Sequence, residues 1–424
     1  MIHRRRFGAH HKKPSAAGTH SSIYLVCAMM LFWTLSEGMV SFIVPLKIQN
    51  AGFTDTMLGV IIGTSSIAGA LFDLVACRLF RNIFYKRIFG FMFILCLSFP
   101  LILMHAGTLL AFVIGMGVWG VYYDLRNIGN FDYIARTTVR SDSTRAFGLI
   151  QVFQSVGWIL GPIIVGFLAG EAVGWKPFAA IYVFLGLAFS FFIALCVAAG
   201  NKRALENSHK EKECRRGTWS EARMLGSVGR VLFPTLLAVF FINFVDSFFW
   251  SIGPLFAEAL KLGFLAGLLM TAWSLPSMLL GWHAGRIAAR YSKERTAYGA
   301  QFASALCLIP IFFVSSGVAV VAMVFVAASF AAIAIPAFQS MFTDYIEVRG
   351  DLEKEIESLE DLYTNLGYVF GPILAGFSSD LLGFNTTFGI LGAVVALIGF
   401  ALIIVDRRDT VPFVQKAPPL ICDI

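Results

Sequence analysis

Residues 157–166 read GWILGPIIVG, and residues 367–376 read GYVFGPILAG. Both stretches follow the pattern G-x-x-x-G-P-x-x-x-G, and the second begins 210 positions after the first. Glycines spaced in this way let helix backbones approach closely, and a proline bends a helix by removing one backbone hydrogen bond. The two stretches therefore predict two equivalent, tightly packed helices. Their packing residues are Gly157, Gly161, Pro162, Gly166, Gly367, Gly371, Pro372 and Gly376.

Further pairs recur at nearly the same shift. Glu37 stands eight residues before Pro45, as Asp246 stands eight residues before Pro254. The tripeptide Asp-Tyr-Ile at residues 132–134 recurs at 344–346. Matches of acids, glycines and prolines in one order indicate an internal duplication. The chain is therefore predicted to consist of two parallel halves, an arrangement found in duplicated membrane transporters.

The composition places these halves in a membrane. Apolar residues make up 58% of the chain and charged residues 14%, against about 45–50% and about 25% in soluble proteins. A membrane-spanning helix needs about 20 mostly apolar residues, and the runs here are too long and too continuous for strands. We predict an all-α membrane protein with twelve spans at 23–46, 57–77, 88–104, 109–134, 146–168, 177–199, 231–256, 263–287, 298–314, 318–342, 358–382 and 386–405.

The spans group into two six-helix bundles with polar segments around them. The predicted divisions are a basic tail at 1–22, the first bundle at 23–199, a linker at 200–230, the second bundle at 231–405 and a second tail at 406–424. If the N-terminus is cytoplasmic, 29 of the 33 Lys and Arg residues fall on the cytoplasmic side. This asymmetry is the positive-inside pattern. The net charge of +7 therefore indicates the orientation in a membrane and not binding to nucleic acid.

Several kinds of chemistry have no motif in this sequence. The chain lacks a phosphate-binding loop, a nucleophile elbow and metal-ligand spacing, so we expect neither an enzyme, nor an ATP-driven pump, nor a cofactor or metal. Five of the seven cysteines lie in predicted spans, which does not suggest a disulfide framework.

Four charged residues lie near the middle of predicted spans: Glu37, Asp124, Arg126 and Asp246. A charge at the bilayer centre costs at least about 2.5–3.5 kcal/mol, so such residues are candidates for function or are paired with one another. Helical spacing places aromatic and amide side chains beside them, namely Trp33, Tyr122, Tyr123, Asn243 and Trp250.

Arg126 and Asp124 are two positions apart and so lie on opposite faces of one helix. We therefore expect Arg126 to find its partner on another helix, with Glu37 at a compatible depth, and Asp124 to face a helix of its own half. The alternative, that these charges form ion pairs that only hold helices together, stays open.

With these motifs in this order along the sequence, the chain resembles the Major Facilitator Superfamily. The pattern at 157–166 is similar to the fifth-helix motif of its proton-driven antiporters, with Val165 in place of a glycine. In the loop after the second span, Gly69 and Asp73 match the family motif and Leu74 departs from it. The resemblance implies that the first, fourth, seventh and tenth spans line a central cavity. It also implies a cytoplasmic gate, for which the candidates are Asp73, Arg286, Glu360 and Asp361.

These observations predict a secondary transporter that works by alternating access. We expect proton-coupled export of small amphipathic or cationic compounds, by a monomer in the cell membrane whose partners are a small-molecule solute, protons and the lipid bilayer. A sugar or metabolite symporter or uniporter is one alternative. A receptor or assembly protein on the same scaffold, without transport, is the other.

The predicted orientation can be tested with reporter fusions. Because the span number is even and the loops on one side are basic, fusions at His20, Lys210 and Gln415 should all report a cytoplasmic location. An external signal from the fusion at Gln415 would contradict the twelve-span arrangement.

Overall fold

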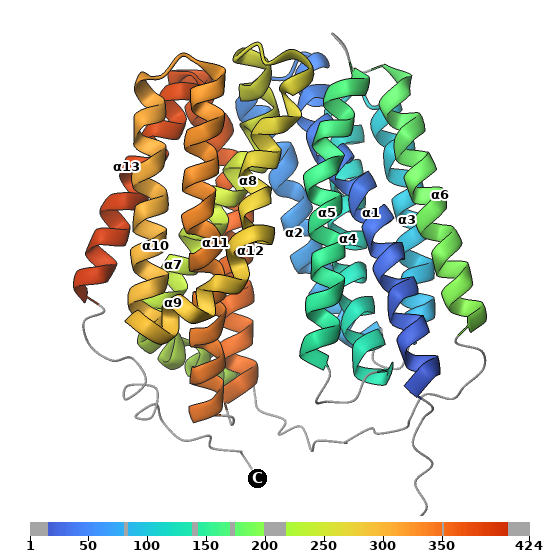
Figure 1. The fold of residues 1–424 in the computed structure, drawn as a ribbon, viewed down its shortest axis with the longest axis horizontal. Helices are drawn as coiled ribbons and strands as arrows, with labels where there is room; N and C mark the ends of the chain where they lie inside the picture. Colours follow the sequence, from blue (N-terminus) through green and yellow to red (C-terminus); the bar gives the residue numbers. More distant parts are fainter. Residues whose placement is uncertain are drawn as a thin grey trace, which may run out of the picture.

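The computed structural model describes residues 16–79, 84–137, 143–169, 174–198, 218–349 and 352–405. Within these ranges the chain consists of helices and the turns that join them, and the long helices run side by side (Figure 1). The helix bounds are α1 (Ala16–Asn50), α2 (Asp55–Leu79), α3 (Tyr85–His105), α4 (Leu109–Thr137), α5 (Ser143–Ala169), α6 (Trp175–Ala198), α7 (Thr218–Ala259), α8 (Gly267–Leu280), α9 (Ala284–Tyr291), α10 (Lys293–Leu308), α11 (Gly317–Val348), α12 (Glu353–Leu382) and α13 (Phe384–Val405).

Length and apolar composition account for most of these elements. Ten helices of the described ranges are long and apolar enough to cross a membrane. The predicted span 263–287 is divided, since the short apolar helix α8 is followed by a 3-10 turn at Gly281–His283 and then by α9. Helix α12 begins with an acidic turn and packs against α2 and α7. The predicted all-helical fold of two six-helix bundles is confirmed, with one span broken.

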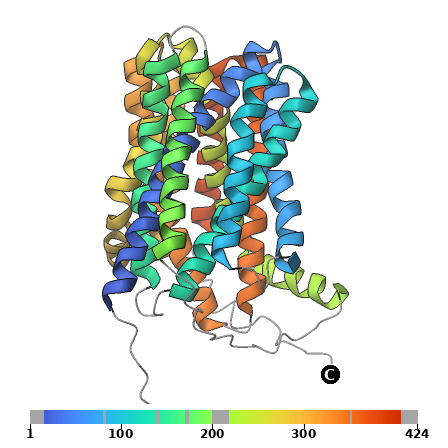
Figure 2. The same ribbon diagram turned by 90° about the vertical axis from the view of Figure 1, so that its right-hand side faces the viewer.

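Several helices begin earlier than the apolar runs predict. Helix α1 begins at Ala16 inside the predicted tail, and α7 begins at Thr218 inside the predicted linker. The first turns of α7 run sideways across the lower end of the bundle in Figure 2. Apolarity marks only the part of a helix that lies in hydrocarbon, whereas backbone hydrogen bonding continues through polar residues beyond it. Residues 1–15 and 406–424 of the predicted tails, residue 199 of the first bundle and residues 200–217 of the predicted linker lie outside the described residues.

The distribution of apolar side chains fits a multi-pass membrane protein. One buried apolar core lies mainly within α1–α6, and two further cores lie within α7–α13. Large apolar side chains also cover the outside of both halves, and a soluble protein rarely exposes so much contiguous apolar surface. Examples with more than half of their surface exposed are Leu71, Ile94, Leu110, Val183 and Leu397.

The two decapeptides pack in equivalent ways within their halves. Helix α5 crosses α1 where Gly157 meets Leu35, and a Cβ on Gly157 would come 2.7 Å from the backbone nitrogen of Leu35. Helix α12 crosses α7 where Gly367 meets Phe240, and a Cβ there would come 2.9 Å from a backbone oxygen. Both distances are too short for a real side chain. The predicted duplication is therefore present in the packing of the helices.

The duplication also extends to the contacts between the halves. The end of the bundle at which α1 begins and α13 ends is here called the terminal end, and the opposite end is called the distal end. Toward the distal end, Gly59 of α2 lies against the carbonyl of Pro372, and Gly267 of α8 lies against the carbonyl of Pro162. A Cβ on either glycine would overlap that oxygen. The two glycines are 208 positions apart, so the same shift relates them.

This packing predicts the effect of adding a side chain at the distal crossing. Gly267→Val should separate α8 from α5, because the backbone of Pro162 cannot move as a flexible side chain can. In a cysteine-free background carrying Ile159→Cys, which lies in the same contact, a polar maleimide should label the purified protein several times faster. The control is Gly186→Val, since Gly186 is exposed on α6 with nothing near its Cβ position. Equal labelling rates in the two variants would show that the crossing does not need a glycine.

Candidate functional site

Glu37 lies in the core of the first half, where it is only 2% exposed. Both oxygens of its carboxylate accept hydrogen bonds from α4. The indole Nε1 of Trp119 donates to Oε2 at 2.9 Å, and the hydroxyl of Tyr122 donates to Oε1 at 2.8 Å. Trp119 and Tyr122 lie three residues apart, so one face of α4 presents both donors. Tyr122, predicted to lie beside the charged residues, and Trp119 therefore both contact the acid of α1.

Asp246 occupies the equivalent position in the second half and has the same two kinds of donor. The indole Nε1 of Trp273 on α8 donates to Oδ1 at 2.7 Å, and the hydroxyl of Tyr368 on α12 donates to Oδ2 at 2.5 Å. These donors come from helices that are not equivalent to α4. The repeat predicted the acid but not the residues that bind it. Tyr368 lies inside the motif at 367–376, which is the one signal that pointed toward it.

Arg126 is buried on α4, 7% exposed, and its contacts differ from the prediction. Its guanidinium lies over the rings of Tyr123 and Trp33, 4.2 and 5.1 Å from their centroids, and Nη2 donates to Oδ1 of Asn127 at 2.7 Å. No ion pair joins it to Glu37 within the described part of the chain. Trp119 and Tyr122 donate one hydrogen bond to each oxygen of that carboxylate, and Arg126 makes no hydrogen bond to it in the described part of the chain.

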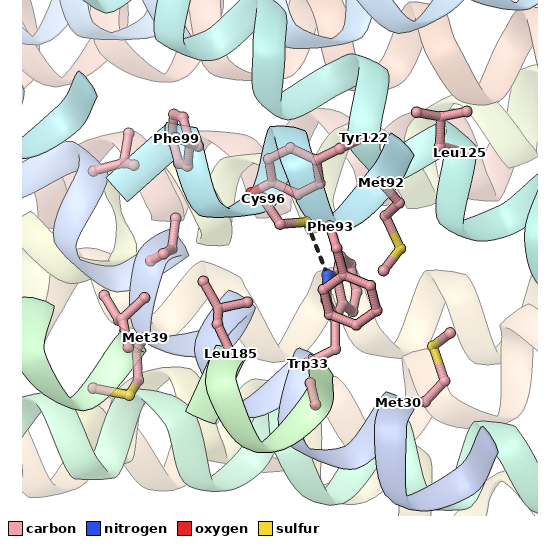
Figure 3. Close-up of a cluster of buried hydrophobic side chains, with 14 of the residues drawn as sticks. Met30, Trp33, Met39, Met92, Phe93, Cys96, Phe99, Tyr122, Leu125 and Leu185 are labelled. Carbon is pink, nitrogen blue, oxygen red and sulfur yellow. Dashed lines mark hydrogen bonds between the residues drawn. The ribbon is translucent and has the colours of Figure 1, made fainter. Parts of the chain in front are cut away.

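Trp33 is a core residue and does not line open space. Its side chain is fully buried, its indole Nε1 lies 3.1 Å from Sγ of Cys96, and its ring meets Tyr122 edge-on (Figure 3). Its ring also supports the guanidinium of Arg126. Trp33 therefore supports the side chain of Arg126 and that of Tyr122, which binds Glu37.

The remaining predicted site residues hold helices together. Asp124 lies against Gly69 of α2, where any Cβ would overlap the carboxylate, so it faces its own half as expected. Asn243 on α7 donates to the hydroxyl of Thr364 on α12 at 3.3 Å. The ring of Trp250 meets Trp158 of α5 at 4.9 Å and so bridges the two halves.

A polar contact that the sequence analysis missed joins the halves at the distal end. Asp380 of α12 accepts hydrogen bonds from the backbone nitrogens of Asp55 and Thr56 at 3.1 and 2.7 Å, and from the Thr56 hydroxyl at 2.5 Å. The hydroxyl of Ser379 donates to Asp55 at 3.1 Å. Asp380 thus caps the N-terminus of α2 from the other half, where a carboxylate is stabilised by the helix dipole.

The predicted gate at the terminal end is not assembled in this conformation. Asp73 on α2 and Asp361 on α12 have the same charge, and Arg286 on α9 is exposed. Among the described residues, no ion pair links Arg286 to Asp73, Glu360 or Asp361. The helices of the two halves also diverge toward the lower end in Figure 1. The gate stays a prediction, and the structure shows the halves in contact at the distal end.

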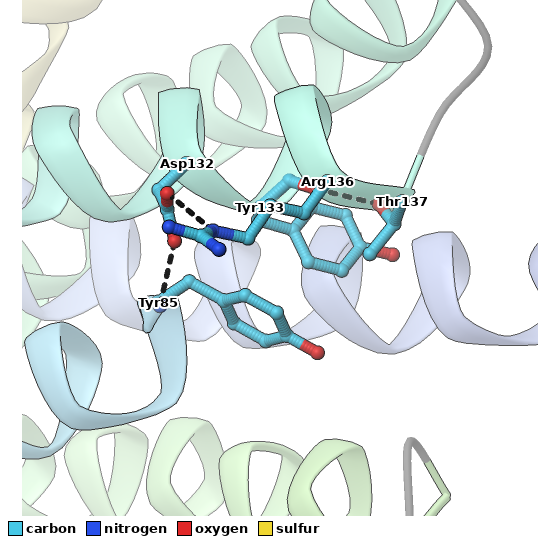
Figure 4. A network of polar contacts seen from close by, with 5 residues as sticks. All are labelled: Tyr85, Asp132, Tyr133, Arg136 and Thr137. Carbon is cyan, nitrogen blue, oxygen red and sulfur yellow. Dashed lines mark hydrogen bonds and ion pairs between the residues drawn. The ribbon is translucent and has the colours of Figure 1, made fainter. Parts of the chain in front are cut away.

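The repeated Asp-Tyr-Ile tripeptides anchor neighbouring helices at the terminal end. Asp132 accepts from the backbone nitrogen of Tyr85, the first residue of α3, at 2.8 Å and from Arg136 at 2.6 Å (Figure 4). Asp344 accepts from Lys293, the first residue of α10, at 2.6 Å. Both acids therefore tie the end of one helix to the start of another, which makes their role structural.

Two repeated six-helix halves with an apolar outer surface and buried charges describe a duplicated multi-pass membrane protein. A family model described as Major Facilitator Superfamily matches residues 26–352. The chain therefore belongs to the Major Facilitator Superfamily, whose members are transporters and not enzymes.

Two curated relatives come from Bacillus subtilis (strain 168). The chain is 26% identical to "Uncharacterized MFS-type transporter YuxJ" over 266 residues, which are 60% of this chain and 64% of the relative. It is 24% identical to "Multidrug resistance protein 2" over 263 residues, 59% of this chain and 61% of the relative. The match thus spans somewhat less than two thirds of either relative.

Solved structures share the fold at low sequence identity. A bacterial homologue of the human lysosomal transporter Spinster, in an inward-facing and unoccupied conformation, gives a TM-score of 0.72 at 12% identity, covering 95% of this chain and 98% of that one. The nucleoside transporter NupG gives 0.66 at 12% identity, covering 92% and 100%. At these identities the likeness concerns the fold alone.

The cap on α2 predicts a measurable effect of removing one carboxylate. Asp380→Ala should weaken the distal contact by about 1 kcal/mol, the usual value of a helix cap, and Asp380→Asn should keep part of it. Hydrogen exchange at the start of α2 should therefore be faster in Asp380→Ala. The control is Asp344→Ala, which removes an acid at the other end of the bundle. If exchange at Asp55 and Thr56 is unchanged, the cap does not stabilise the contact.

Proposed function

We propose that this transporter exports small amphipathic or cationic compounds in exchange for protons, with Glu37 as the principal proton-carrying residue. The observation that carries the proposal is the environment of Glu37. Its carboxyl group is buried in an apolar bundle and receives hydrogen bonds only from neutral donors, while the nearest cation, Arg126, forms no ion pair with it. A carboxyl in this position can exchange its proton for a contact with Arg126.

Coupling requires that the two conformations bind the proton differently. Glu37 on α1 is held by α4, and α1 also crosses α5 at glycines that place no side chain between the helices. Small shifts of these helices as the halves move would change the distance from Glu37 to Arg126. Because a ligand shifts a conformational equilibrium only through different affinities for its states, this change would couple the proton to transport.

Asp246 supports the second part of the proposal, the nature of the solute. It is half-buried, and the indole of Trp273 and the phenol of Tyr368 donate hydrogen bonds to its carboxylate. Aromatic side chains together with a negative charge suit amphipathic and cationic solutes. The relative named "Multidrug resistance protein 2" is consistent with such solutes, at 24% identity.

Transport against pH in proteoliposomes tests this proposal. Glu37→Gln should abolish accumulation driven by a proton gradient while leaving downhill exchange, because the amide keeps the shape of the site and cannot carry the proton. Asp246→Asn should have a milder effect, since Arg126 lies beside Glu37. The measurement uses the cationic dye ethidium, with and without an imposed gradient.

The matched control is Glu258→Gln, which replaces an exposed acid at the distal end of α7. Full gradient-driven transport in both Glu37→Gln and Asp246→Asn would mean that these acids are structural, and Asp124 would be the next candidate. Flux that never responds to the gradient, in any variant, would favour a uniporter. Binding without any flux would favour a receptor on this scaffold.

A further inference from the structure

Arg126 makes fewer hydrogen bonds than either of the two central acids, Glu37 and Asp246. Each oxygen of Glu37 and of Asp246 accepts one hydrogen bond from an indole or a phenol. The guanidinium of Arg126 carries five N–H groups, but only Nη2 has a hydrogen-bond acceptor in the described part of the chain. Its Nε is buried without any partner. The site therefore lacks hydrogen-bond acceptors for the remaining N–H groups of Arg126.

The aromatic rings beside Arg126 offset only part of the cost of burying a charge without an acceptor. A cation over an aromatic face gains about 0.5–2 kcal/mol, whereas removing the partner of a buried charge costs about 3–5 kcal/mol. Tyr123 and Trp33 supply two such faces. They hold the guanidinium plane in place and leave its N–H edge for an acceptor, which is the arrangement that suits recognition of a planar anionic group.

Neither neighbouring acid of the same half provides that acceptor here. Glu37 is bonded to Trp119 and Tyr122, and Asp124 on the opposite face of α4 packs against Gly69. One turn further along α4, Oδ1 of Asn130 is also buried without a partner. Two of the unpartnered buried polar atoms in the described residues thus lie on one stripe of α4, four positions apart.

Side chains of both halves near this stripe are only partly buried. Tyr123 and Asn127 flank Arg126 on α4 and are half-buried, as are Asp246 and Tyr368 of the other half. A group that enters between α4 and the α7–α12 pair would therefore meet aromatic side chains first and the guanidinium behind them.

We propose that Arg126 binds an anionic group of the solute, so that the transported compounds are amphipathic molecules with a carboxylate or a similar acid group. This inference rests on the proposed function, because it names the solute class for the same site. Of the amphipathic and cationic compounds named in the proposed function, the inference favours the amphipathic ones. Compounds that carry only a positive charge should bind more weakly. The apolar part of the solute would lie against Tyr123, Trp250 and Tyr368. A second charge is not required.

Binding of matched compounds to the purified full-length protein tests the proposal. Naphthyl, biphenyl and indolyl scaffolds are each compared as the carboxylic acid, the methyl ester and the primary amine, by ligand-induced thermal shift and by quenching of tryptophan fluorescence. On at least one scaffold the acid should bind about tenfold more tightly than its ester, as expected for a charge-assisted hydrogen bond. Arg126→Gln should remove this difference, and Arg126→Lys should retain part of it.

Arg136→Gln is the control, because Arg136 lies on the same helix but is tied to Asp132 at the terminal end. It should leave the preference for the acid unchanged. The proposal is overturned if no acid binds better than its ester on any scaffold, if the amines bind best, or if folded Arg126→Gln keeps the preference. The comparison of acids, esters and amines on the wild-type protein can overturn the proposal by itself. The test therefore remains decisive even if Arg126→Gln fails to fold.

The outcome separates this inference from the proposed function. Proton-driven transport of ethidium with no preference for acids would leave the proposed function standing and remove the role of Arg126. Flux is therefore measured with ethidium and with the acid that binds best. A preference for acids that Arg126→Gln abolishes, without gradient-driven flux of either compound, would support the anion site and contradict proton coupling.

Discussion

The close approach of helix backbones at glycine is the constraint on which the rest of this structure depends. Without side chains at Gly157, Gly161, Gly367 and Gly371, α5 reaches α1 and α12 reaches α7. These crossings set the depth and rotation of α1 and α7, which carry the two central acids. In a membrane, apolar side chains gain little by meeting each other instead of lipid, so close packing and interhelical hydrogen bonds determine which helices associate.

The same packing principle operates between the halves, but only over part of their length. Gly59 and Gly267 allow α2 and α8 to meet the proline carbonyls of α12 and α5, and Asp380 adds hydrogen bonds to the start of α2. Toward the terminal end the acids Asp73 of α2 and Asp361 of α12 have the same sign, and no ion pair joins either of them to a cation among the described residues. The halves are therefore held together mainly at the distal end in this conformation.

The buried charges are held by aromatic side chains more than by each other. Glu37 and Asp246 each have an indole and a phenol as donors, and Arg126 has two ring faces. Neutral donors satisfy the carboxylate oxygens without adding a positive charge beside them. An ion pair between Glu37 and Arg126 would instead hold both residues in one arrangement. No such pair is present among the described contacts, so neither residue is fixed by the other.

The sequence alone determined the number and apolar extent of most spans, the duplication, the packing glycines and the positions of the charged residues. These features are local, because span length, helical period and the cost of burying a charge can be read along one chain. Only the tertiary structure decided that Trp273 and Tyr368 bind Asp246, that Asp380 caps α2, and that Arg126 faces rings and not Glu37. Apart from the contact of Arg126 with Tyr123 on the same helix, those contacts join residues 27 to 325 positions apart. They depend on the rotation and depth of separate helices, which no periodicity within one helix specifies.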